Sequence, residues 1–357
     1  MTITETDVLI IGAGLTGLTL AYRLRDTPLS VKLVEARDRI GGRIHTIYGE
    51  NGGSQEMGAT WLGRKHISLF ALLKELDLAT FTQILGDKAV FEPISTSPPQ
   101  IVSLPPNSDP SFRIKGGTSK LIKTLANHLS PEQIITSSPI QSITKEKEVF
   151  LVKGTHQIFK AKKVVSTLPP YLLSQTIKIS PSLPKSILEI AAKTHTWMGE
   201  SIKVGLTYKT PFWKAKNTSG TIISNVGPIP EMYDHSNFEE TAFGLKGFFN
   251  GSYFSVSKEE RLALVLQQLE KYYGPQVKTY LTYDETVWRK EPYTFTPYES
   301  HLLPHQNNGH PVFRQAILGG QFFVAGAETA KSHPGYMDGA ISSANFVYEE
   351  LKGSLVS

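Results

Sequence analysis

The stretch that decides the fold is "DVLIIGAGLTGLTLAYRLRD", residues 7–26, in which three glycines separate a short apolar run from an amphipathic segment. The apolar run predicts a strand and the amphipathic segment predicts a helix. A second apolar run at residues 30–36, "SVKLVEA", predicts another strand. Gly12, Gly14 and Gly17 form G-x-G-x-x-G between the first strand and the helix, where glycine allows a tight turn and a close approach of a pyrophosphate. The sequence therefore predicts a βαβ unit that binds a dinucleotide.

A carboxylate follows at the position that such a site requires. Glu35 ends the second predicted strand, eighteen residues after Gly17, where it can accept hydrogen bonds from ribose hydroxyls. Taken alone, Glu35 is also explained as the solvated end of a strand. The glycine motif before it favours the ribose contact.

Composition excludes several classes of function. The chain has 357 residues, of which 40% are hydrophobic and 19% charged, as in ordinary globular proteins, and this length favours two structural units. No run approaches the roughly 20 apolar residues of a membrane span, and the start "MTITETDVLI" lacks the pattern of a signal peptide, so we expect no membrane segment and a cytoplasmic location.

The charged, cysteine and histidine residues exclude other partners. The chain has no cysteine, so we expect no disulfide, no thiolate metal site and no cofactor linked through sulfur. Its ten histidines show no metal-ligand spacing, and its 37 lysines and arginines are dispersed. We therefore expect neither a metal ion nor nucleic acid.

The residues after Glu35 distinguish between the dinucleotides. The stretch "EARDRIGGR", residues 35–43, resembles the extended signature of FAD enzymes of the monoamine oxidase type. The resemblance implies that Gly41, Gly42 and Arg43 approach the phosphates of FAD, and that Ala36 and Arg37 belong to the same cofactor site. The alternative for Arg43 is a surface cation.

The resemblance continues along most of the chain in the same order. "MGATWLG" at 57–63 is similar to the loop beside the flavin ring, "RIKGGTSKLIKTLA" at 113–126 to the middle glycine pair and helix, and "VVSTLPP" at 164–170 to the strand after it. "GAETA" at 326–330 and "PGYMDGA" at 334–340 resemble the C-terminal flavin motif. The resemblance implies further cofactor contacts at Gly58, Ala59, Thr60, Trp61, Ile140 near the adenine, Gly326, Glu328 near the ribitol or phosphates, and the main chain of Met337 and Asp338.

A lysine interrupts an alternating strand in "GESIKVGLTYKTPFW", residues 199–213. Ile202 and Val204 would share one face, and Lys203 and Gly205 the other, so a solvated lysine is the ordinary interpretation. The segment resembles the family's strand whose lysine holds a water against flavin N5. We therefore expect Lys203 to face the cofactor, with Gly205 leaving room there and with burial lowering the lysine pKa.

Two tyrosines resemble the aromatic cage of the family. Tyr336 lies within "PGYMDGA", and Tyr298 follows Trp288 by ten residues, which is the family's spacing for the second ring. Two such rings would orient an amine before the flavin. Tyr293 is the rival for the second position, and any of these rings could instead be a core aromatic.

The chain also departs from the family. Only about fifty residues separate "TWLG" from "IKGG", where most relatives have a long helical part of the substrate domain. The cover of the pocket should be reduced, which leaves open a homo-oligomer that closes the site. Pro297 stands where some relatives have a cysteine that links the flavin, so we expect noncovalent FAD. Arg64 and Arg113 are the candidates for binding a substrate carboxylate.

These observations predict an α/β flavoprotein with a Rossmann-like FAD-binding domain (residues 1–78, 112–190 and 292–357) and a smaller β-rich α+β substrate domain (79–111 and 191–291). The resemblance implies an FAD-dependent amine oxidase: a small amine gives a hydride from its α-carbon to flavin N5, and O2 reoxidises the flavin to give H2O2. One alternative is an enzyme similar to desaturases or porphyrinogen oxidases, acting on a carbon skeleton. Another is a flavin-bound interaction protein, and a nicotinamide dehydrogenase is the least favoured.

Overall fold

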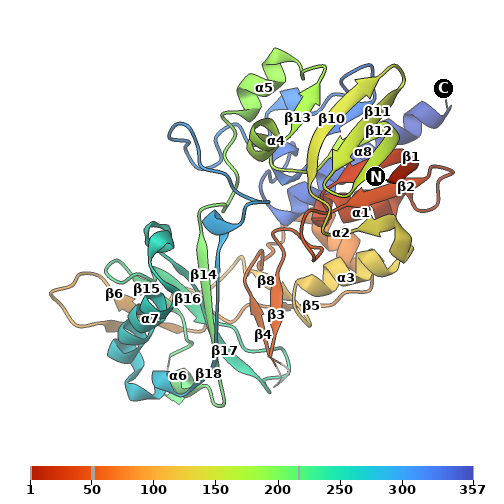
Figure 1. The fold of residues 1–357 in the computed structure, drawn as a ribbon. Coiled ribbons are helices and arrows are strands. Elements are labelled where there is room, and N and C mark those ends of the chain that lie inside the picture. Colours follow the sequence, from red (N-terminus) through yellow and green to blue (C-terminus); the bar gives the residue numbers. More distant parts are fainter. Residues whose placement is uncertain (1, 50–52, 216–217, 357) are drawn as a thin grey trace.

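Two large sheets organise the chain in the computed structural model, which describes residues 2–49, 53–215 and 218–356 (Figure 1). The first sheet has the strand order β13-β10-β11-β12-β1-β2-β9, with β19 beside β12. Its strands are β1 (Thr2–Ile11), β2 (Val31–Val34), β9 (Ile134–Ile135), β10 (Ile140–Glu146), β11 (Val149–Gly154), β12 (Gln157–Ser166), β13 (Lys178–Ser180) and β19 (Phe322–Val324).

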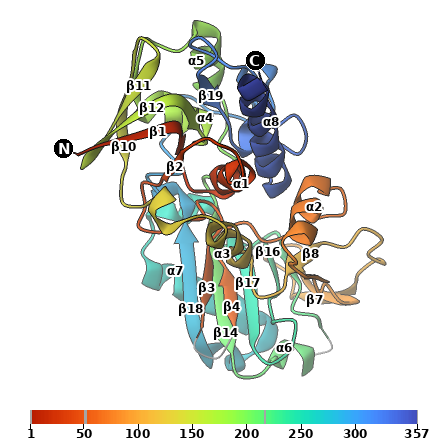
Figure 2. The same ribbon diagram turned by 90° about the vertical axis from the view of Figure 1, so that its right-hand side faces the viewer.

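The predicted βαβ unit is confirmed at the centre of this sheet. β1 is parallel to both β2 and β12, and its residues Val8–Ile11 are buried on both faces, as expected for a central parallel strand. Helix α1 (Leu15–Leu24) connects β1 to β2 and lies beside the C-terminal helix α8 (Met337–Val356), as Figure 2 shows. The first and last helices of the chain therefore cover the same region of the sheet.

The second sheet has the order β18-β14-β17-β16-β15-β6-β7. Its strands are β6 (Lys88–Glu92), β7 (Gln100–Ser103), β14 (Ile202–Tyr208), β15 (Ile222–Ser224), β16 (Glu231–Asp234), β17 (Phe243–Phe249) and β18 (Tyr280–Val287). Helix α7 (Lys258–Tyr273) begins with a capping box between Ser257 and Glu260 and packs Val265 and Leu269 into the core of this sheet. Strands β6 and β7 form an antiparallel hairpin.

The remaining strands and helices of the chain are short. Two ribbons pair β3 with β4 and β5 with β8. These elements are β3 (Thr46–Tyr48), β4 (Ser54–Glu56), β5 (Thr80–Thr82), β8 (Phe112–Ile114), α2 (Ile67–Glu75), α3 (Ser119–Asn127), α4 (Pro170–Thr176), α5 (Lys185–Ala191) and α6 (Phe212–Ala215). Among the helices of the described residues, none is both long and apolar enough to pass through a membrane.

Strand β14, which carries Lys203, is buried on both faces, so the ordinary interpretation of a solvated lysine does not hold. The space at Gly205 is filled by protein, contrary to our expectation that it leaves room for the cofactor. A Cβ atom at Gly205 would overlap the side chain of Gln55 on β4. Gly205 therefore allows β4 to pack against β14.

Candidate active site

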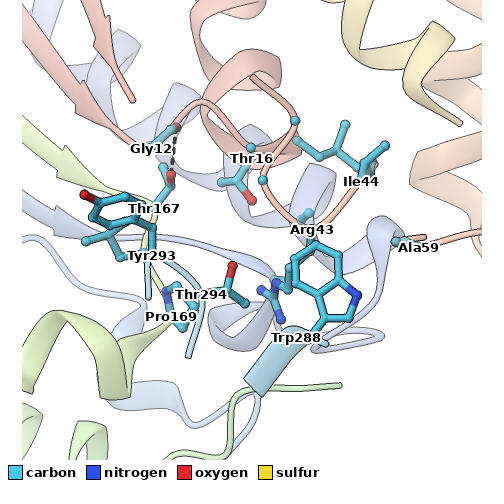
Figure 3. A pocket seen from close by; sticks show the side chains of 18 of the residues that line it. Gly12, Thr16, Arg43, Ile44, Ala59, Thr167, Pro169, Trp288, Tyr293 and Thr294 are labelled. Atoms are coloured by element: carbon cyan, nitrogen blue, oxygen red, sulfur yellow. Dashed lines mark hydrogen bonds between the residues drawn. The ribbon is translucent and has the colours of Figure 1, made fainter. Parts of the chain in front are cut away.

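A cavity of about 850 Å³ is lined by residues of both sheets and of the loops between them (Figure 3). A volume of this size suits a large organic ligand. Most of the residues that the sequence predicted for the site line this cavity. They are Gly12, Gly14, Glu35, Ala36, Arg37, Gly41, Gly42, Arg43, Gly58, Ala59, Thr60, Trp61, Ile140, Lys203, Tyr336 and Met337.

Five predicted site residues do not line the cavity: Gly17, Gly326, Glu328, Tyr298 and Asp338. The side chain of Asp338 is buried, and its Oδ1 accepts from the N–H of Leu69 at 2.9 Å. Gly17 faces β1, because a Cβ atom there would overlap the carbonyl oxygen of Gly12. Gly326 has φ +132° and lies against the carbonyl of Thr167, so its role is in the backbone turn. The positions of Glu328 and Tyr298 are described with their partners below.

The glycine turn after β1 leaves open space at one position. Gly12 has φ +103°, and the hydroxyl of Thr167 donates to its carbonyl at 3.0 Å, as Figure 3 shows. Gly14 has an ordinary φ of −76°, and the nearest atom to an added Cβ would be Cα of Gly42 at 3.9 Å. Protein packing therefore does not explain glycine at position 14. A pyrophosphate at the N-terminus of α1 does explain it, because its oxygens need that space.

Substitution of Gly14 and Gly17 by alanine should separate cofactor binding from folding. Gly14→Ala is expected to weaken FAD binding by about tenfold or more without changing the unfolding of the apoprotein. Gly17→Ala is expected to destabilise the apoprotein by about 1–3 kcal/mol, because the added methyl group overlaps the carbonyl oxygen of Gly12. Flavin fluorescence titration and urea unfolding measure the two effects. Equal FAD affinity in Gly14→Ala and the wild type would contradict the pyrophosphate assignment.

Glu35 is held at the end of β2 by backbone groups. Its side chain is buried, Oε2 accepts from the N–H of Ala13 at 2.9 Å, and Oε1 accepts from the N–H of Arg37 at 2.9 Å. Because the carboxylate of Glu35 is buried, the alternative interpretation of this residue as the solvated end of a strand does not hold. A carboxylate has about four acceptor positions, so two are left for ribose hydroxyls.

Arg43 and Glu328 form a two-pronged ion pair beside the cavity. Nη1 of Arg43 lies 2.5 Å from Oε1 of Glu328, and Nη2 lies 2.8 Å from Oε2. The N–H of Trp197 also donates to Oε1 at 3.2 Å. Burial alone would raise the pKa of Glu328, but the facing guanidinium outweighs it and lowers this pKa. Both oxygens of Glu328 bind Arg43, and Glu328 does not line the cavity, so its role in this structure is to position Arg43. Its contact with the ribitol or phosphates stays a prediction.

Lys203 lies in the cavity as predicted. Its side chain is buried, and Nζ donates to the carbonyl of Gly58 and lies 3.5 Å from the hydroxyl of Thr60. Burial lowers the pKa of Lys203 to about 8. The lysine therefore titrates near neutral pH, where it can exchange a proton or hold a water molecule.

Sequence reasoning missed a second buried lysine, Lys246. It lies on β17 opposite Gly205, is fully buried, and donates to the same Thr60 hydroxyl. Burial and the nearby Lys203 lower the pKa of Lys246 well below its usual value. The available signal was a lysine inside the apolar run "FGLKGFF" at 243–249.

The aromatic wall differs from the predicted pair. Tyr336 lines the cavity, and the ring that faces it there is Trp197, at 5.7 Å between centroids. Tyr298 packs away from the cavity: its hydroxyl accepts from the N–H of Thr196 at 3.0 Å, and its ring lies against Tyr171. The rival Tyr293 lines the cavity, but beside Arg37.

Neither candidate for a carboxylate clamp reaches the cavity. Arg113 is buried and donates to the carbonyl of Ser236 at 2.9 Å, and burial lowers its pKa to about 10. Arg64 is exposed on the surface. Neither residue lines the cavity. Within the described residues, no group of three or more acidic or histidine side chains could hold a metal ion.

Comparison with known proteins identifies the family of the chain. The model of the family "Flavin containing amine oxidoreductase" matches residues 15–96 and 95–347. The probable flavin-containing monoamine oxidase A of Dictyostelium discoideum is 25% identical over 456 aligned residues, covering 98% of each chain. Rat flavin-containing amine oxidase B is 25% identical over 450 residues, covering 97% of this chain and 86% of the rat protein.

Solved structures share the fold. Wild-type putrescine oxidase bound to putrescine superposes with a TM-score of 0.84 at 21% identity, covering 98% of this chain and all of that one. Cyclohexylamine oxidase from Brevibacterium oxydans gives a TM-score of 0.84 at 19% identity, covering 99% of this chain and all of that one. With the family model matching most of its length, the chain belongs to the flavin-containing amine oxidoreductases.

Proposed function

We propose that this protein oxidises a small amine, with noncovalent FAD as the electron acceptor and O2 as the reoxidant. The observation that carries the proposal is that buried Lys203 and the ring of Tyr336 line the same cavity as the glycine motifs of the cofactor site. Bound FAD would supply the two-electron acceptor that side chains lack. The absence of cysteine supports noncovalent binding.

The chain itself would hold and orient the reactants. The N-terminus of α1 at Gly14 would bind the pyrophosphate, Glu35 would accept from ribose hydroxyls, and Arg43, fixed by Glu328, would present its guanidinium to the cofactor. Met337 begins the long helix α8, whose N-terminal N–H groups favour negative charge.

Three side chains would act on the substrate side. The rings of Trp197 and Tyr336, whose centroids are 5.7 Å apart, would form one aromatic wall against which the amine lies, and they would exclude water. Lys203 would hold a water molecule or give a proton to oxygen as negative charge develops there.

The domain division is also part of the proposal. All strands of the first sheet fall within residues 1–78, 112–190 and 292–357, and all strands of the second sheet fall within 79–111 and 191–291. This distribution supports an FAD-binding domain and a substrate domain with those boundaries. With these boundaries Lys203 would belong to the substrate domain and would face the cofactor loops.

The visible absorption spectrum of the purified protein tests the proposed function. Flavin bands that bleach on anaerobic addition of a primary amine, and return with peroxide release on admission of O2, are the expected result. Flavin bands that no amine in a broad panel bleaches would favour a carbon-skeleton substrate or an interaction protein. A protein that does not bind FAD would overturn the cofactor assignment.

A further inference from the structure

We infer that Glu231 binds a second cationic group of the substrate, so that the preferred substrates are α,ω-diamines or similar amines with a distal positive charge. This inference rests on the proposed function, because it names the substrate class of the same cavity. Lys203 lies at the end of the cavity where the amine would react. Glu231 provides a carboxylate at the other end of a row of paired residues that crosses three strands of the second sheet.

Strand register places these residues in one row. Lys203 on β14 pairs with Phe248 on β17, and Phe248 pairs with Glu231 on β16. Directly paired residues of neighbouring strands point to the same face of a sheet, and all three residues line the cavity. Since adjacent strands lie about 4.8 Å apart, two strand spacings separate the backbones of Lys203 and Glu231 by roughly 10 Å.

Aromatic rings form the floor between the two ends of this row. The ring centroid of Phe248 is 4.8 Å from Nζ of Lys203, and Trp61 lies 5.9 Å from Phe248. Trp61 in turn lies 5.3 Å from Tyr233, which follows Glu231 by two residues on the same face of β16. A methylene chain would bury its surface on these rings, and a cation at its end would also be attracted by their faces.

The carboxylate of Glu231 has little to neutralise it within the protein. In the part of the chain described, Glu231 forms no ion pair within 4 Å, and its Oε2 accepts from the hydroxyl of Tyr233 at 2.8 Å. Burial and the adjacent Glu231 raise the pKa of Tyr233, so its hydroxyl stays protonated and continues to donate. The remaining acceptor positions of a half-buried carboxylate at a cavity wall suit an ammonium group.

Lys203 does not supply this counter-charge. Its Nζ is engaged by the carbonyl of Gly58 and forms no ion pair with Glu231 in the described part of the chain, although the charge of Glu231 raises the pKa of Lys203 against the larger effect of burial. A monoamine would leave Glu231 desolvated and unpaired, whereas a diamine would pair it.

The test compares matched amines on the holoenzyme. We measure kcat/KM by peroxide release for α,ω-diamines and n-alkylamines of equal carbon number, from three to eight carbons. At the best chain length the diamine should be preferred by roughly 10- to 100-fold, the value of a hydrogen bond to a charged group. Glu231→Gln should abolish this preference, and Glu231→Asp should shift the optimum to a longer diamine. Glu240→Gln, an exposed glutamate of the same domain, is the control and should keep the preference.

A binding measurement gives a second readout without turnover. Calorimetric titration of the holoenzyme with 2,5-diamino-2,5-dimethylhexane, which has no α-hydrogen, should show tighter binding than with 2-amino-2-methylhexane. Glu231→Gln should remove the difference.

The outcomes separate this inference from the proposed function. If no amine bleaches the flavin, the proposed function fails and this inference fails with it. If amines are oxidised but diamines are not preferred, or if the preference survives in Glu231→Gln, the second-cation site is wrong and the amine oxidase function stands.

Discussion

Replacing Lys203 by methionine is expected to slow oxygen consumption with a saturating amine by about 100-fold, the usual value of a positioned acid or base, while FAD remains bound. Methionine keeps the length and apolar stem of the side chain, so the packing of β14 should survive. It removes the Nζ group that reaches the carbonyl of Gly58 inside the cavity. Oxygen consumption and the flavin absorption spectrum together distinguish lost chemistry from lost cofactor.

The pH profile provides the sharper form of this test. Burial lowers the pKa of Lys203 to about 8, so its positive charge is present below that pH and is lost as the pH rises through it. Because the ammonium stabilises negative charge developing on oxygen, the reaction of the reduced wild-type protein with O2 should slow above about pH 8. Lys203→Met should show no such inflection.

The control is Lys209→Met, an exposed lysine just after the same strand. It should keep both the rate and the inflection near pH 8. Wild-type oxygen consumption in Lys203→Met at all pH values would return Lys203 to a structural role.

Motifs that act through short chain segments were predictable from the sequence. The turn from Gly12 to Gly17 brings β1, α1 and the cavity together within a few residues, so spacing alone located it. Glu35 was predictable for the same reason, because it directly follows its own strand β2. Helix α7 has bounds that its periodicity and its N-terminal cap determine. In these cases local geometry decides where the side chain points.

Residues that depend on pairing between distant strands were not predictable. Glu231 and Lys246 join Lys203 only through the register of β16, β17 and β14, which no local pattern reveals. Tyr298 shows the opposite error: its spacing from Trp288 fits the family, but its ring packs against Tyr171 outside the cavity. Trp197 takes the position facing Tyr336, because the loop before β14 passes beside the C-terminal motif.

Replacing Glu328 by glutamine is expected to reduce the stability of the apoprotein by about 3–5 kcal/mol, the cost of removing one partner of a buried ion pair. Glutamine has nearly the same volume, so no cavity is created. The guanidinium of Arg43 loses the carboxylate that accepts two of its N–H groups, and the side chain of Glu328 is fully buried, so no water replaces it. Urea-induced unfolding followed by tryptophan fluorescence measures the loss.

The pH dependence of this loss identifies its electrostatic origin. The pKa of Glu328 in the folded protein is lowered from its ordinary 4.5, so the ion pair contributes fully above about pH 4.5 and is lost as the pH falls through the lower folded value. The difference between wild type and Glu328→Gln should therefore be constant from pH 5 to 8 and shrink in more acidic solution. Glu189→Gln, which breaks an exposed pair with Lys185, is the control and should cost under about 1 kcal/mol. A loss equally small in Glu328→Gln would mean that Arg43 does not depend on Glu328, and the positioning role of this glutamate would be wrong.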